Sequence, residues 1–213
     1  MLPACVLFDL DGTLLDHFKA IHRCHSHAMT QLGLPAPSMD EVRAAVGGGL
    51  ELAVERLVGP ERKAAALALY RPHWDATMLF DVELLPGARE ILTALRQRGI
   101  RTAVFTNKHG PSSRAVCAHL GVDALLDANL GATDTPWLKP DPRFAQHALT
   151  LLGAAPSATV LVGDSPFDCA AARNADLAFI GVATGTHTAD ELRTAGATRV
   201  CANLDEVARE LGL

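Results

Sequence analysis

Residues 5–13 read CVLFDLDGT, a short apolar run that ends in two aspartates, a glycine and a threonine. Later runs repeat this design, being rich in Val, Ile, Thr and Phe and short enough for strands buried on both faces. They are IRTAVFT (100–106), ATVLVGD (158–164), LAFIGVAT (177–184) and ATRVCA (197–202). We therefore expect the opening run ACVLFDLD (4–11) to form one strand of the same sheet.

Amphipathic helices are predicted between these strands, for example at 144–152 and 204–211, where apolar residues recur at helical spacing. Thr188 with Glu191, and Asn203 with Glu206, have the spacing of capping boxes at helix starts. Alternating strands and helices predict an α/β fold with a doubly wound, Rossmann-like parallel sheet.

Residues 16–80 interrupt this alternation, because they contain helical patterns and no convincing strand. The expected helices are 17–32, 38–45 (capped by Ser38 with Glu41), 50–58 and 61–79. We therefore expect a catalytic core made of residues 1–15 and 81–213, with a small all-helical cap, residues 16–80, inserted after the first strand.

The bulk composition excludes several classes of partner. The formal net charge of the 213 residues is −5, and lysine and arginine are scattered. The sequence therefore has no basic stripe of the kind that would predict binding to nucleic acid or to an anionic membrane. No apolar run approaches the length of a membrane span. Five cysteines without paired spacing favour reduced thiols and a cytoplasmic location. The oligomeric state, monomer or homodimer, stays open.

Polar residues follow the predicted strands, and ligands of a parallel sheet bind beyond the carboxyl ends of its strands. Asp9, Asp11 and Asp164 would therefore approach one another, which close carboxylates tolerate only with a cation among them. Oxygen ligands of this kind select Mg²⁺. Lys139 and Thr106 could hold phosphoryl oxygens, and Gly12 and other backbone amides could approach the anion closely.

Four segments in this order resemble the motifs of the haloacid dehalogenase superfamily: DLDGT (9–13), TN (106–107), KP (139–140) and GDSPFD (163–168). The resemblance implies a magnesium-dependent phosphatase that acts through a phospho-aspartate intermediate. It implies that Asp9 is the nucleophile and a metal ligand. Asp11 would be the general acid–base, with its backbone carbonyl on the metal.

The same resemblance implies roles for the remaining motif residues. Thr106 and Lys139 would bind the phosphoryl group with help from the Asn107 backbone, Asp164 would be a further Mg²⁺ ligand, and Asp168 would support Lys139 or the surroundings of the metal. An acid at Asp11 favours phosphate esters, because the superfamily's dehalogenases and phosphonate-cleaving members lack it.

The segment VGGGLELAVERL (46–57) resembles the corresponding cap segment of bacterial phosphoglycolate phosphatases. We therefore expect a small, acidic phosphorylated metabolite, with 2-phosphoglycolate as the first candidate and Gly48 in the loop that enters the site. His17 or Arg43 could supply a polar contact to the substrate. The other histidines up to His27 are expected to have packing or surface roles.

Three alternatives remain. A phosphosugar mutase similar to β-phosphoglucomutase would need basic residues around the cap loop, and none follows Gly49 directly. An inorganic pyrophosphatase of the same superfamily would share the motifs. A binding protein that has lost catalysis would lack one of the motif acids or Lys139, and all are present.

Overall fold

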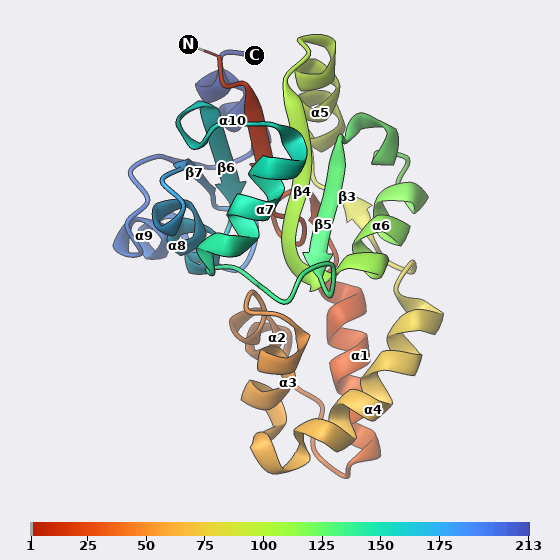
Figure 1. Cartoon of the computed structure of the whole chain (residues 1–213). Helices are drawn as coiled ribbons and strands as arrows, with labels where there is room; N and C mark the ends of the chain where they lie inside the picture. Colours follow the sequence, from red (N-terminus) through yellow and green to blue (C-terminus); the bar gives the residue numbers. More distant parts are fainter. Residues whose placement is uncertain (1) are drawn as a thin grey trace.

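The computed structural model describes residues 2–213, and its centre is one six-stranded parallel sheet (Figure 1). The strand order is β5-β4-β1-β6-β7-β8, so β1 lies in the middle, between β4 and β6. The strands are β1 (Cys5–Phe8), β4 (Arg101–His109), β5 (Ala128–Ala132), β6 (Thr159–Gly163), β7 (Ala178–Val182) and β8 (Val200–Cys201).

Helices cover both faces of this sheet. α5 (Ala88–Gln97), α6 (Gly110–His119) and α10 (Leu204–Leu211) pack on one face, and α7 (Pro142–Leu152) and α8 (Pro166–Asn174) pack on the other, with α9 (Ala189–Thr194) beside α8. Side chains of β1 alternate between the two cores: Val6 and Phe8 face the first, Cys5 and Leu7 the second. All four are fully buried, as expected for a central strand. The doubly wound α/β fold predicted from the sequence is confirmed.

Four further helices lie together beyond the carboxyl ends of the strands (Figure 1). We call α1 (Phe18–Gln31), α2 (Met39–Ala45), α3 (Leu50–Val58) and α4 (Pro60–Thr77) the cap helices. They enclose apolar clusters of their own, in which α1 packs closely along α4. The chain leaves the sheet at β2 (Leu15–Asp16) and returns at β3 (Glu83–Leu84), which pair as an antiparallel ladder.

Local signals located most helix boundaries. The capping boxes at Ser38 and Thr188 are present as predicted. At the last helix the Asn203 side chain accepts from the Glu206 backbone N–H, but the Glu206 carboxylate accepts from Ala202, so the box expected there is incomplete.

Two strand predictions need correction. β5 was not predicted, because its sequence ANLGA lacks β-branched residues. It is buried because it pairs with β4 and is covered by helices. β4 continues three residues beyond the predicted end at Thr106, to His109. Among residues 2–213, no helix combines the length and apolarity needed to cross a bilayer.

Candidate active site

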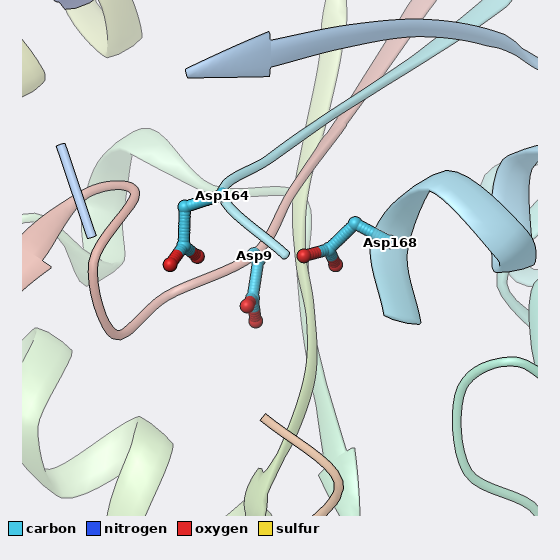
Figure 2. Close-up of side chains that lie close together, drawn as sticks. All are labelled: Asp9, Asp164 and Asp168. Atoms are coloured by element: carbon cyan, nitrogen blue, oxygen red, sulfur yellow. The ribbon is translucent and has the colours of Figure 1, made fainter. Parts of the chain in front are cut away.

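Three aspartates meet where the central strands end. Asp9 follows β1, and Asp164 and Asp168 follow β6, Asp168 being in the first turn of α8. One carboxylate oxygen from each lies within 4.8 Å of the other two, and all three residues are buried. Figure 2 shows Asp9 between the other two side chains. The strand order creates this cluster, because β1 and β6 are neighbours although about 150 residues separate them in sequence.

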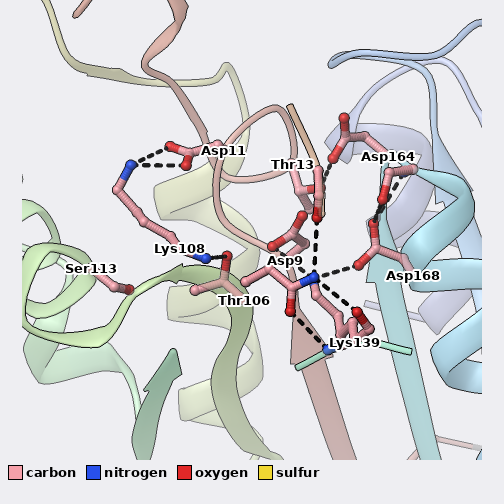
Figure 3. Close-up of polar contacts among 12 residues, drawn as sticks. Asp9, Asp11, Thr13, Thr106, Lys108, Ser113, Lys139, Asp164 and Asp168 are labelled. Carbon is pink, nitrogen blue, oxygen red and sulfur yellow. Dashed lines mark hydrogen bonds and ion pairs between the residues drawn. The ribbon is translucent and has the colours of Figure 1, made fainter. Parts of the chain in front are cut away.

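The three carboxylates differ in how many of their oxygens are already engaged. Asp168 accepts from Lys139 Nζ at 2.6 Å with Oδ1 and from the Ser165 backbone and hydroxyl with Oδ2. Asp164 accepts from Thr13 with Oδ1 and from Thr186 with Oδ2 (Figure 3). Asp9 differs from both, because its Oδ1 has no hydrogen-bond partner.

Oδ1 of Asp9 is buried and lies 2.9 Å from Lys139 Nζ, but the two atoms lack hydrogen-bond alignment. A buried carboxylate oxygen without a donor is costly, so such an atom marks a place for a further ligand.

Burial and mutual repulsion dominate the electrostatics of the carboxylate cluster. Burial, with Asp168 adding to it, raises the pKa of Asp9 to about 6. Burial, with Asp9 and Asp168 adding to it, raises the pKa of Asp164 to about 7. Lys139 is buried as well, but the charges of Asp168 and Asp9 outweigh this and raise its pKa. One ammonium thus contacts two of the three carboxylates, Asp9 and Asp168, and the oxygen donors of Asp9 and Asp164 suit Mg²⁺.

Asn107 fixes the loop that carries Lys139. Its side-chain carbonyl accepts from the Lys139 backbone N–H at 2.8 Å, and its amide donates to the Lys139 carbonyl at 3.0 Å and to the Gly47 carbonyl at 3.1 Å. The amide therefore joins β4, the Lys139 loop and the loop before α3. Thr106 is buried beside it and accepts from the Lys108 backbone N–H.

Two glycines allow the chain to pass close to Asp164. A Cβ on Gly12 would lie 2.7 Å from Asp164 Oδ2, and one on Gly185 would lie 2.0 Å from the same oxygen. Gly12 also has a φ of +85°, which favours glycine. Any side chain at these positions would displace the Asp164 carboxylate.

Asp11 points to a different set of partners (Figure 3). Lys108 Nζ donates to both of its oxygens, at 3.1 and 2.8 Å, and to His17 Nδ1 at 3.1 Å. The other His17 nitrogen lies 2.6 Å from the Met78 carbonyl, which requires its proton to be there. Although burial opposes it, Lys108 with His17 holds the pKa of Asp11 below its ordinary value. The Lys108 ammonium also lies over the Trp74 ring of α4, 4.5 Å from its centroid.

Sequence reasoning missed Lys108. The available signal was its position, directly after the Thr106–Asn107 pair at a strand end; the pairing with Asp11 spans 97 residues and has no local signature. Thr186, which donates twice to Asp164, was missed for the same reason.

A cavity of about 310 Å³ lies between these residues and the cap helices. Asp9, Asp11, Thr106, Asn107 and Asp164 line its core side.

The cap side of the cavity differs from expectation. Gly47 and Gly49 line the wall, whereas Gly48 packs toward Phe167. His17 is fully buried against Asp11 and Lys108 and is outside the wall. Arg43 is outside it too, since its guanidinium lies over Phe18 and donates to the Gly185 carbonyl.

Comparison with known proteins decides the family. Residues 6–182 match the family described as "Haloacid dehalogenase-like hydrolase". The chain belongs to this family.

Three relatives show its neighbourhood within the family. "Probable phosphatase IndB" of Dickeya dadantii is 34% identical over 89% of this chain and 85% of that protein. A phosphoglycolate phosphatase of Cereibacter sphaeroides is 32% identical over 82% of each chain. "Tyrosine-protein kinase PtkA" of Mycobacterium tuberculosis is 31% identical over 99% of this chain and 73% of that protein, and its solved structure superposes with a TM-score of 0.86, at 29% identity, over 100% and 99% of the two chains. Two of these three relatives are named as phosphatases.

Proposed function

We propose that this protein hydrolyses small phosphate monoesters with Asp9 as nucleophile and with Mg²⁺ as cofactor. The observation that carries the proposal is the buried, unsatisfied Oδ1 of Asp9, which lies beside the Lys139 ammonium at the floor of a cavity. A carboxylate in this position can attack a phosphorus atom that is held by charge from the same side.

In the first step, an Asp9 oxygen attacks phosphorus and the alkoxide leaves, so that a phospho-aspartate forms. Lys139 and the Thr106 hydroxyl lie at the same strand ends and would bind the phosphoryl oxygens. Asp168 holds the Lys139 ammonium in place through the 2.6 Å contact. The role of Asp168 is therefore to support Lys139.

Asp11 would protonate the departing alkoxide and then take a proton from the water that cleaves the acyl phosphate. In this structure both its oxygens are engaged by Lys108, so Asp11 has to leave Lys108 before it can act as an acid.

The residues fit a magnesium ion. Asp9, Asp164 and the Asp11 backbone carbonyl would hold it, and it would supply positive charge that offsets the negative charge of the reacting phosphoryl group. The raised pKa values of Asp9 and Asp164 support this assignment, since they reflect carboxylates without enough positive charge nearby.

For the substrate, 2-phosphoglycolate is the first ester to test. The segment 46–57 and relatives that bear the name phosphoglycolate phosphatase support it. A phosphosugar mutase and an inorganic pyrophosphatase remain alternatives, and sugar-phosphate product analysis and pyrophosphate in the assay separate them. The compartment and the choice between monomer and homodimer stay predictions.

The test is release of phosphate from 4-nitrophenyl phosphate and from 2-phosphoglycolate, with Mg²⁺ or with excess chelator. We expect activity only with Mg²⁺, inhibition by Ca²⁺, whose coordination is longer and looser, and a loss of at least about 10³-fold in Asp9→Asn. Asp190→Asn is the matched control, because Asp190 is 93% exposed on α9. An Asp9→Asn variant with more than about a tenth of wild-type activity would remove Asp9 from the nucleophile role.

A further inference from the structure

The end of the cavity farthest from Asp9 is enclosed by three of the cap helices. Its wall is mainly apolar and aromatic, with side chains from α1, α3 and α4: Ile21, His25, Leu50, Ala53, Tyr70 and Trp74. A volume of about 310 Å³ is at the lower end for small-molecule sites. It leaves room for an organic group beyond the phosphoryl group.

Two polar side chains in this wall have no partner. His25 is 3% exposed and Tyr70 is 4% exposed, and their rings touch, with centroids 4.8 Å apart. Among residues 2–213, neither the imidazole nitrogens nor the phenol oxygen form a hydrogen bond with another residue. Both residues line the cavity, so their polar atoms are available to a molecule bound in it.

The charges around this part of the cavity disfavour an anion. Lys108 is engaged by Asp11, and Arg71 pairs with Glu51 at 2.5 Å. Asp75 also lines the wall and adds negative charge. Until Asp11 turns to the leaving oxygen, a carboxylate or a second phosphate would therefore find no lysine or arginine without an anionic partner among the described wall residues.

We propose that His25 and Tyr70 form a leaving-group subsite that binds the hydroxyl groups of an uncharged, hydroxylated alcohol, such as a polyol or a sugar. The inference rests on the proposed phosphatase function and favours a hydroxylated substrate over 2-phosphoglycolate, the first candidate named above. Tyr70 can donate one hydrogen bond and accept others, and a neutral imidazole offers one donor and one acceptor. Burial, with a smaller contribution from His22, lowers the pKa of His25 to about 4, which keeps the ring neutral at pH 7.

The spacing of residues on α1 and α4 explains why the two residues face each other. Ile21 and His25 are four residues apart on α1, as are Tyr70 and Trp74 on α4, so each helix presents one stripe to the cavity. Because α1 packs along α4, the two stripes form adjoining walls.

The experiment compares four esters with the full-length protein and Mg²⁺: ribose 5-phosphate and glycerol 3-phosphate, whose leaving groups are uncharged and hydroxylated, 2-phosphoglycolate, which carries a carboxylate, and ethyl phosphate, which has neither. We expect kcat/KM for the better of the two hydroxylated esters to exceed that for 2-phosphoglycolate by roughly tenfold or more. The loss of one well-placed hydrogen bond can produce a difference of this size.

Tyr70→Phe removes one hydroxyl and keeps the ring. It should lower kcat/KM for the hydroxylated esters by about three- to tenfold, mainly through KM, and should affect ethyl phosphate less. His25→Leu should act in the same direction. His27→Leu is the matched control, because His27 stacks on His73, outside the cavity wall.

A higher kcat/KM for 2-phosphoglycolate in the wild-type protein, or equal losses for all four esters in both variants, would overturn the subsite. The first criterion needs no variant, so it holds even if a substitution prevents folding. Absence of Mg²⁺-dependent phosphate release from every ester, 4-nitrophenyl phosphate included, would instead refute the proposed phosphatase function on which the subsite depends.

Discussion

Lowering the pH should weaken the cap helices through His25. The ring is 3% exposed between α1 and α4, and burial lowers its pKa from 6.5 to about 4. A group whose pKa is lower in the folded protein is protonated first in the unfolded chain, so its contribution to stability is complete above pH 6.5 and is lost as the pH falls toward 4. At pH 5 the loss relative to pH 8 is about 2 kcal/mol, and its limit below pH 4 is about 3 kcal/mol.

The assay is denaturant unfolding of the wild type and of His25→Leu between pH 8 and pH 5, at constant Mg²⁺. Other groups titrate in this range as well. These effects are common to both proteins, so the difference between their free energies of unfolding isolates His25. We expect the wild type to lose about 2 kcal/mol relative to the variant. A difference that stays constant across this range would refute the burial argument.

Two further perturbations test the core of the site. Lys139→Met should destabilise the protein by about 3–5 kcal/mol in denaturant unfolding, because it leaves the buried Asp168 and Asp9 carboxylates without their cation. Adding Asp168→Asn should recover part of this loss. If the effects of the two substitutions on the free energy of unfolding simply add, the pairing is contradicted. Gly185→Ala should raise the Mg²⁺ concentration for half-maximal activity by roughly tenfold or more, because its Cβ would lie 2.0 Å from Asp164 Oδ2 and must displace that ligand. Gly181→Ala, with its nearest contact at 3.2 Å, is the control, and an equal shift there would contradict the explanation.

The sequence predicted the parts of the site that depend on strand ends. Asp9, Thr106 and Asp164 each follow an apolar run, and the edge rule for parallel sheets brings such residues together without knowledge of the strand order. β5 escaped prediction because its burial comes from neighbours and not from its own composition.

The cap residues could not be assigned in the same way, for a physical reason. A residue that lines an internal cavity and a residue that fills a core follow the same helical period, so the burial of His25 and Tyr70 reads from the sequence as ordinary packing. What separates the two cases is whether the polar atoms find partners, and this depends on the packing of α1 against α4. His17 shows the other outcome: it was one of two candidates for a polar contact to the substrate, and its two nitrogens are engaged by Lys108 and the Met78 carbonyl. His25 and Tyr70 differ from core residues in that they line the cavity and have no hydrogen-bond partner in the protein, so they are the residues to substitute.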